Sequence, residues 1–248
     1  MNNIKKYLNK LLFVICVICL LFSTLKLISI GLENKEEKDY KDNINNIVSI
    51  PDANKESGDV NFKELKKLNS KINSYIKIPN TEITFPIIKG EDNDFYLNHN
   101  LEDQINNYGS IYMDFRNDSN YKDFNTYIYG HNVMGGGMFS ELENYENVDF
   151  IKNHKKMYLF TEKENFDLEV FAVYSGPITD GSYFVNNHSN QKELNDYLFK
   201  LKKQCLYFDD SVKLSINDHI VTLFTCSLKE GLDSDLRITV FARIIPNK

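Results

Sequence analysis

The chain has 248 residues, of which 42% are hydrophobic and 26% charged, with four cysteines and no tryptophan. This composition is typical of a globular domain and argues against collagen-like, coiled-coil, disulfide-rich and wholly disordered chains. The net charge of −6 is unevenly distributed, because residues 1–31 contain four lysines and no acidic residue. Residues 32–248 therefore carry 25 basic and 35 acidic residues, a net charge of −10. Nucleic acid is not an expected partner of such an acidic body, because phosphate contacts need clustered lysine and arginine.

An apolar run follows the lysine-rich N-terminus and covers residues 11–30, with Lys26 as its one charge. Twenty residues at the helical rise span about 30 Å, the thickness of the bilayer core. We predict a cytoplasmic segment over residues 1–10 and an uncleaved transmembrane signal anchor over 11–30. The positive-inside rule then places the rest of the chain outside the cell. A cleaved signal peptide is the alternative, disfavoured because no small-x-small cleavage site follows the run.

Residues 31–60 are polar and contain Pro51 and Gly58. They are predicted to link the membrane segment to one domain formed by residues 61–248. At the start of this domain, apolar residues recur at three- and four-residue spacing over residues 61–76, which predicts a helix. The same spacing predicts a helix over residues 190–206, and shorter helical patterns occur at residues 138–145 and 149–154.

After Pro79 the pattern changes to short runs of β-branched and aromatic residues separated by turn residues. Alternation of apolar and charged residues in segment 166–174 predicts a strand with one exposed face. Segment 220–225 shows no alternation, which is typical of a central strand covered on both faces. Seven or eight such strands with few helices between them predict a closed or nearly closed β-barrel. The expected strands cover residues 83–88, 109–113, 126–129, 156–161, 166–174, 219–225 and 236–245.

The four cysteines fall into different environments. Cys16 and Cys19 lie inside the apolar run, so only Cys205 and Cys226 belong to the exported domain. A disulfide between them is left open by the sequence. Cys205 falls on the apolar face of the helix predicted at residues 190–206, which indicates a small buried hydrophobic residue. Cys226 instead ends an apolar strand, a position that favours a reactive thiol.

A histidine and an arginine are candidates to act with this thiol. A thiolate is a strong nucleophile, and a neighbouring histidine can assist it and protonate a leaving amine. Among the five histidines only His131 ends a hydrophobic strand. Arg237, one of three arginines, begins the last strand, and antiparallel pairing with the preceding strand brings it toward Cys226. There it can stabilise a developing oxyanion, although an ion pair with Asp233 or Asp235 is an alternative role.

These motifs resemble those of the sortases, the membrane-anchored cysteine transpeptidases of Gram-positive surfaces. The resemblance rests on segment 222–226 (TLFTC), on the upstream segment 129–132 (YGHN) and on Arg237 with its apolar strand. It extends over about residues 62–245, and the helices around the barrel resemble class B in particular. Two positions differ from the usual class B pattern: Phe224 replaces a frequent serine, and the interval from cysteine to arginine is long.

The resemblance implies a closed eight-stranded sortase-type β-barrel with an N-terminal helix and a helix inserted before the cysteine strand. It implies that Cys226 attacks the carbonyl after threonine in the C-terminal sorting signal of a surface protein. His131 would exchange protons with the leaving and incoming amines, and Arg237 would hold the oxyanion. An amino group of a peptidoglycan precursor would then resolve the thioacyl enzyme, and no cofactor is implied. The residues implied to line the peptide groove are Asn93, Leu97, Tyr129 and Thr225.

Three other functions remain open at this point. A pilin-polymerising sortase would use the same residues and join a lysine side chain, and a cysteine protease would let water resolve the thioester. A membrane-tethered binding domain would use Cys226 only structurally. A metal site is not expected, because no His/Cys pair has ligand spacing and Asp114, Asp118 and Asp123 do not form a calcium-binding loop.

Overall fold

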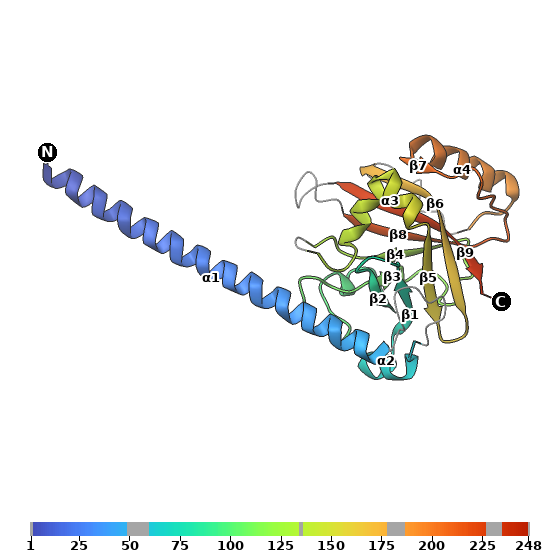
Figure 1. Ribbon diagram of the computed structural model, residues 1–248, viewed down its shortest axis with the longest axis horizontal. Helices are drawn as coiled ribbons and strands as arrows, with labels where there is room; N and C mark the ends of the chain where they lie inside the picture. Colours follow the sequence, from blue (N-terminus) through green and yellow to red (C-terminus); the bar gives the residue numbers. More distant parts are fainter. Residues whose placement is uncertain (1, 49–59, 134–135, 178–186, 227–234, 248) are drawn as a thin grey trace. The chain divides into compact units, whose positions relative to one another are not determined.

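The structure is a computed structural model that describes residues 2–48, 60–133, 136–177, 187–226 and 235–247 (Figure 1). It divides into two units, a single N-terminal helix and a β-barrel. The helices are α1 (Asn2–Val48), α2 (Phe62–Leu68), η1 (Phe95–Leu97), η2 (Ser140–Glu146), α3 (Val148–Asn153) and α4 (Gln191–Gln204), of which η1 and η2 are 3-10 helices. The strands are β1 (Ile72–Lys77), β2 (Thr84–Lys89), β3 (Tyr112–Met113), β4 (Asn125–Tyr129), β5 (Lys156–Thr161), β6 (Asn165–Pro177), β7 (Tyr207–Phe208), β8 (Ile220–Cys226) and β9 (Leu236–Pro246).

The first unit consists of α1. Its segment Lys5–Leu32 is long and apolar enough to cross a bilayer, by length and composition. The helix continues beyond residue 30, where the apolar span was predicted to end, and reaches Val48 within the predicted linker. Glutamate and lysine, both strong helix formers, are frequent in this polar extension and favour its helical state. Residues 49–59 of the predicted linker lie outside the described residues.

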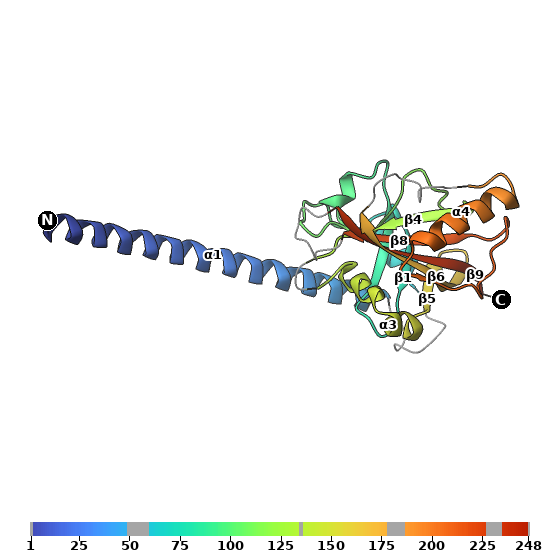
Figure 2. The same ribbon diagram turned by 90° about the horizontal axis from the view of Figure 1, so that it is seen from above.

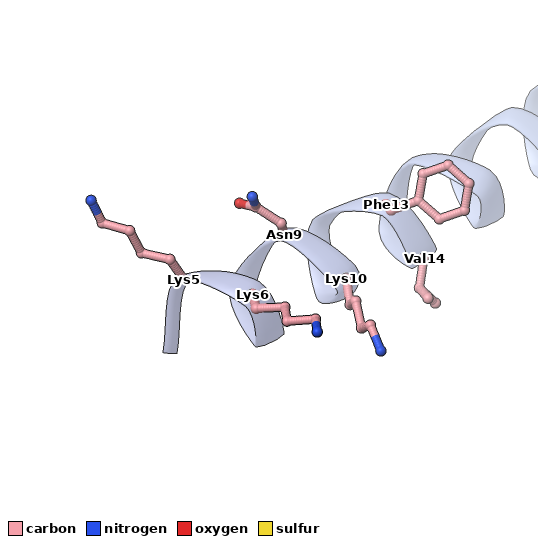
Figure 3. Close-up of a pocket in the computed structure, with 6 residues that line it drawn as sticks. All are labelled: Lys5, Lys6, Asn9, Lys10, Phe13 and Val14. Carbon is pink, nitrogen blue, oxygen red and sulfur yellow. The ribbon is translucent and has the colours of Figure 1, made fainter. Parts of the chain in front are cut away.

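The first turns of α1 are basic. Figure 3 shows Lys5, Lys6 and Lys10 on the turns that precede Phe13 and Val14, around a shallow hollow. The described residues that line this hollow all belong to the one helix. The change from lysine to apolar side chains marks the start of the predicted membrane span.

The second unit is a closed barrel. Its strands follow the order β5-β1-β2-β3-β4-β8-β9-β6, and an additional pairing between β5 and β6 closes the ring. Most neighbours are antiparallel, whereas β2–β3 and β4–β8 are parallel. The two-residue strand β7 adds to the side of β6. The predicted closed eight-stranded barrel is therefore confirmed.

Alternating strand residues fill the barrel interior. Ile76, Ile128, Val221 and Val240 belong to this buried cluster, and each comes from a different strand. Helices η2 and α3 supply further side chains to the same cluster, among them Leu142. The barrel therefore has one continuous core, which fixes the register of the strands that carry the site.

Helix α4 packs on the outside of the barrel. Its buried residues Leu194, Tyr197 and Leu201 contact a second cluster that contains Phe171 of β6 and Phe241 of β9. Figure 1 shows α4 and β7 together, and both figures show α4 beside the long strands β6 and β9. The helix predicted over residues 190–206 is confirmed, and it directly precedes the segment that leads to β8.

The helix predicted over residues 61–76 is wrong beyond Leu68. Helix α2 ends there, and β1 begins at Ile72 between β2 and β5. Nearly every side chain of β1 is buried, so its isoleucine and tyrosine residues are not confined to alternate positions. A strand covered on both faces lacks a period of two, and here its apolar residues happened to continue the helical spacing. The short strand β7 was also missed.

Candidate active site

Three neighbouring strands bring the predicted catalytic residues to one end of the barrel. The parallel pair β4–β8 aligns Tyr129 with Phe224, and the antiparallel pair β8–β9 aligns Cys226 with Arg237. The same register, carried two residues beyond Tyr129, places His131 beside Cys226. The antiparallel pairing expected for Cys226 and Arg237 is confirmed.

The alternation of strand side chains places these groups on one face. Val221 and Leu223 of β8 belong to the barrel interior, so Cys226, an odd number of residues further along, lies on the outer face. On β9, Ile238 faces the interior and the adjacent Arg237 faces outward. Directly opposite residues of an antiparallel pair share a face, so the guanidinium and the thiol are on the same side.

Gly130 lets β4 pass close to the core just before His131. Its N–H donates to the Phe224 carbonyl at 3.1 Å, which continues the β4–β8 pairing. A Cβ at this position would lie 2.3 Å from Ile111 Cδ1 and 2.7 Å from Phe139 Cδ2. Glycine is thus required here by close packing.

A backbone carbonyl orients the His131 imidazole. Its Nε2 lies 2.6 Å from the oxygen of Leu97 in η1. A carbonyl only accepts hydrogen bonds, so Nε2 carries a proton and donates it. The other ring nitrogen, Nδ1, has no hydrogen-bond partner among the described residues. Main-chain bonding also fixes the histidine, since the Phe139 N–H donates to the His131 carbonyl at 2.9 Å.

Two further contacts hold the ends of these strands. The side-chain amide of Asn132 donates to the Cys226 carbonyl at 3.0 Å and ties the end of β4 to the end of β8. Arg237 Nη1 donates to the Leu236 carbonyl at 2.9 Å. Cys226 and Arg237 are both half-buried, and Cys226 is a free thiol.

Tyr129 is enclosed by aromatic rings on the same face. Its ring centroid lies 5.3 Å from that of Tyr112 and 5.6 Å from that of Phe224, which it meets edge to face. Phe224, which replaces a frequent serine of the class B pattern, therefore packs directly against the predicted groove. Burial and the adjacent Asp114 carboxylate, which accepts from Tyr129 Oη at 2.9 Å, raise the pKa of Tyr129.

The other predicted groove residues occupy different positions. Asn93 is half-buried and donates to Asp114 at 3.0 Å, whereas the Leu97 side chain is 40% exposed beside the carbonyl that holds His131. Thr225 lies on the interior side of β8, opposite to Cys226, and is 2% exposed. Its hydroxyl is buried without a hydrogen-bond partner among the described residues.

Sequence reasoning missed the roles of three residues near the thiol. Tyr112 is buried and pairs with Tyr129 across β3 and β4. Burial raises its pKa, and the nearby carboxylates of Asp94 and Asp114 raise it further. Asp114 directly follows β3, and Asn132 directly follows His131 just beyond the end of β4. Polar residues at the ends of apolar strands were therefore the feature of the sequence that could have pointed to both.

The second cysteine of the barrel has a different environment. Cys205 follows the last turn of α4 and packs against the outer cluster, where burial raises its pKa to about 12. Cys205 and Cys226 are both free, so the possible disulfide between them is absent from the structure. Across the described ranges, no group of three histidine, cysteine or acidic side chains is arranged to hold a metal ion.

The geometry agrees with comparisons to known proteins. The family profile of the sortase domain matches residues 76–245. Sortase B of Listeria monocytogenes is 35% identical over 237 residues, which cover 93% of this chain and 94% of the relative. Sortase B of Bacillus anthracis in complex with AAEK1 superposes with a TM-score of 0.74 at 30% identity, covering 88% of this chain and 100% of that one. A sortase B–substrate complex of Staphylococcus aureus gives a TM-score of 0.69 at 32% identity, covering 75% and 85% of the two chains.

These matches extend over both the barrel and the strands that carry His131, Cys226 and Arg237. The family profile alone spans more than half of the chain and includes all three residues. The relatives in these comparisons are sortase B proteins, which agrees with the class B resemblance expected from the helices around the barrel. The chain is therefore a member of the sortase family of transpeptidases, and it is similar to class B sortases.

Proposed function

We propose that this sortase cleaves a C-terminal sorting signal after threonine and transfers the released acyl group to an amine of a peptidoglycan precursor. The observation that carries this proposal is the register of β4, β8 and β9, which brings His131, Cys226 and Arg237 to one face. The extent of the similarity supports it, because the relatives match this chain over nearly its whole length.

The proposed acylation uses these three side chains in turn. The Cys226 thiolate attacks the threonine carbonyl carbon, and the Arg237 guanidinium hydrogen-bonds the developing oxyanion. The imidazolium of His131 protonates the leaving amine as the C–N bond breaks, which leaves a thioester on Cys226. Because the Leu97 carbonyl holds Nε2–H, the transferred proton comes from Nδ1.

The second half-reaction reverses the proton transfer. The incoming amine attacks the thioester carbonyl, neutral His131 accepts a proton at Nδ1, and the C–S bond breaks to release Cys226. Two solved structures support an acyl donor and a small amine as the two partners. One is the sortase B–substrate complex of Staphylococcus aureus, and the other is a sortase B complexed with triglycine.

We further propose that Asn93, Leu97 and Tyr129 contact the donor peptide. Leu97 holds His131 through its carbonyl, and Tyr129 precedes His131 by two residues. Asn93 donates to Asp114, which also accepts from Tyr129. Thr225 supports this groove from the interior side of β8, because its side chain is turned away from that of Cys226.

In the cell, we propose that residues 11–30 anchor the chain in the membrane and that residues 61–248 form the extracellular catalytic domain. Residues 1–10 stay in the cytoplasm, and residues 31–60 connect the two parts. The apolar segment of α1 and the lysines that precede it support this arrangement.

The test compares full-length wild type with Cys226→Ala and with the matched variant Cys205→Ala, all in detergent. The substrates are fluorogenic peptides with one fixed threonine and randomised neighbours, with triglycine as the acceptor. Cys226→Ala is expected to lose more than about a thousandfold in rate and to form no thioester by mass spectrometry. Cys205→Ala is expected to retain activity, because Cys205 packs on α4 outside the site.

Thiol labelling provides an independent measurement. The reagent MTSET, present in a Staphylococcus aureus sortase B structure, is added at pH 8 and the labelled peptides are mapped. Cys205, with its pKa raised to about 12, remains protonated at this pH and should react slowly. Rapid Cys226 labelling and its loss in Cys226→Ala are expected, whereas peptide transfer retained by folded Cys226→Ala would contradict the mechanism.

A further inference from the structure

Asp114 is a buried carboxylate beside the predicted groove. It directly follows β3, its N–H donates to the Tyr127 carbonyl at 3.0 Å, and its side chain is 0% exposed. Burial alone would raise its pKa, but the hydrogen bonds it accepts lower the pKa to about 2. The group is therefore ionised at neutral pH. The donors to its two oxygens are Arg116 N (2.9 Å), Nε (2.9 Å) and Nη2 (2.7 Å), Tyr129 Oη (2.9 Å) and Asn93 Nδ2 (3.0 Å).

An ionised carboxylate only accepts hydrogen bonds, which fixes the polarity of its neighbours. Tyr129 has one hydroxyl proton, and that proton is donated to Asp114. Toward a bound peptide, Tyr129 Oη can therefore act only as an acceptor. Asn93 is held in one orientation, because one of its two amide protons is donated to Asp114 and its oxygen accepts from the Phe115 N–H at 3.1 Å.

This fixed tyrosine lies on the face of the sheet that carries the thiol. Tyr129 precedes His131 by two residues and pairs with Phe224, which precedes Cys226 by two residues. Side chains two residues apart share a face of a strand. The Tyr129 hydroxyl is held by the Asp114 carboxylate, whose side chain is 0% exposed.

We propose that Asp114 is a positioning residue that sets hydrogen-bond polarity in the groove, holding Tyr129 as an acceptor for an N–H group of the acyl-donor peptide. This inference rests on the proposed function, because it concerns how the same site recognises its donor. It specifies which chemical group of the donor peptide is recognised, namely an amide N–H. The three catalytic candidates alone do not specify that group.

The test uses full-length enzyme and the best threonine-containing peptide from the library screen. In a set of analogues, each backbone N–H in turn is replaced by an ester oxygen, and each side-chain amide is dimethylated. One replacement is expected to raise KM about three- to tenfold in the wild type, the effect of one lost hydrogen bond, with kcat unchanged. The same replacement should have no effect in Tyr129→Phe, which has no hydroxyl, or in Asp114→Asn, whose amide can donate to Tyr129.

The matched control is Asp123→Asn. Asp123 lies in the same β3–β4 connection and also accepts several hydrogen bonds, from Asn117 and Asn187 side chains and the Asp118 N–H. It does not contact Tyr129 or Asn93 in the described structure, so its variant should keep the wild-type analogue profile. Thermal unfolding and the MTSET labelling rate of Cys226 check that each variant is folded with an intact thiol.

The outcomes separate the inference from the proposed function. If folded Asp114→Asn keeps the full sensitivity to the critical replacement, or if no replacement affects the wild type, Asp114 does not set polarity through Tyr129. If the wild type forms no thioester with any peptide of the library, the proposed function itself fails.

Discussion

At the scale of single residues, the imidazole of His131 is oriented by a main-chain group. In many serine and cysteine proteases a side-chain carboxylate or amide holds the catalytic histidine. Here the Leu97 carbonyl accepts from Nε2, and Gly109 makes room for that carbonyl. Gly109 has a φ of +59°, and a Cβ on it would lie 2.5 Å from the Leu97 oxygen. The position of the imidazole therefore depends on backbone packing in two loops.

Gly130→Ala should disturb this arrangement directly. The new Cβ would overlap Ile111 Cδ1 and Phe139, so we expect a loss of about 1–3 kcal/mol in stability. We also expect a fall in kcat, because His131 is the next residue. The measurements are the melting temperature and the peptide-transfer rate.

A second substitution tests the cause of that loss. Ile111→Val removes the Cδ1 atom nearest to the new methyl group and should restore part of the stability of Gly130→Ala. An unaltered melting temperature in Gly130→Ala, or no recovery in the double variant, would show that the packing argument is wrong.

Arg237 and Arg243 provide a matched pair on β9. Both lie on the outer face, but Arg243 pairs with Glu169 at 2.5 Å and donates to the Lys213 carbonyl at 3.3 Å, away from the thiol. We expect Arg237→Ala to lower kcat/KM by about 10²- to 10³-fold, the usual effect of removing an oxyanion donor. Arg243→Ala should change stability more than rate. Similar kinetic losses in both variants would move the oxyanion role away from Arg237.

At the scale of elements, the sequence predicted the strands whose pattern is local. β5 and β9 were expected within one residue of their bounds, because their ends coincide with turn residues and their apolar pattern is clear. β1 was missed because its identity depends on partners far along the chain, such as Thr161, which pairs with Ser74. Tertiary pairing thus decided an element that local spacing assigned to a helix.

In the candidate site, too, local patterns could be predicted from the sequence and long-range contacts could not. Arg237 beside Cys226 could be predicted, because adjacent strands joined by a loop usually form an antiparallel pair. The role of Asp114 could not, since its contact with Tyr129 depends on the β3–β4 register and on the loop conformation that places Asn93. Such contacts join residues with no common sequence periodicity.

Asn69 connects two elements that support the groove. It ends α2, its Oδ1 accepts from the Lys71 N–H at 2.9 Å, and its Nδ2 donates to Asp103 at 2.9 Å. Tyr96 of η1 donates to the same Asp103 oxygen at 2.8 Å, so the turn before β1 is linked to the helix that carries Leu97. We expect Asn69→Ala to destabilise the barrel by about 1–2 kcal/mol.

The loss should also be visible locally. Hydrogen exchange at the amides of residues 95–99 is expected to become faster in Asn69→Ala, and the peptide KM to rise with the disturbed Leu97 loop. Lys63→Ala, an exposed change on the same helix α2, is the control and should leave both unchanged. Unchanged exchange in residues 95–99 of the Asn69 variant would show that this connection does not hold the loop.

At the scale of the whole molecule, charge is distributed unevenly along the chain. The four lysines of residues 1–31, a segment without acidic residues, lie in the helical unit, whereas residues 32–248, which include the polar end of that helix, carry a net charge of −10. A basic start to an apolar helix favours retention of that end in the cytoplasm. The basic N-terminus therefore supports the proposed orientation of the helix in the membrane. The barrel fold depends instead on the pattern of apolar residues in its strands.

The topology leads to a prediction about the intact protein. Expressed in a Gram-positive host with an N-terminal epitope, the chain should remain in the membrane fraction at its full mass of 28.9 kDa plus the epitope. Protease added to protoplasts should digest the barrel and spare the epitope. Replacing Lys5, Lys6 and Lys10 by glutamate should reduce this protection, because it removes most of the charge bias that orients the helix. Recovery of a shortened chain from the medium would instead identify residues 1–30 as a cleaved signal peptide.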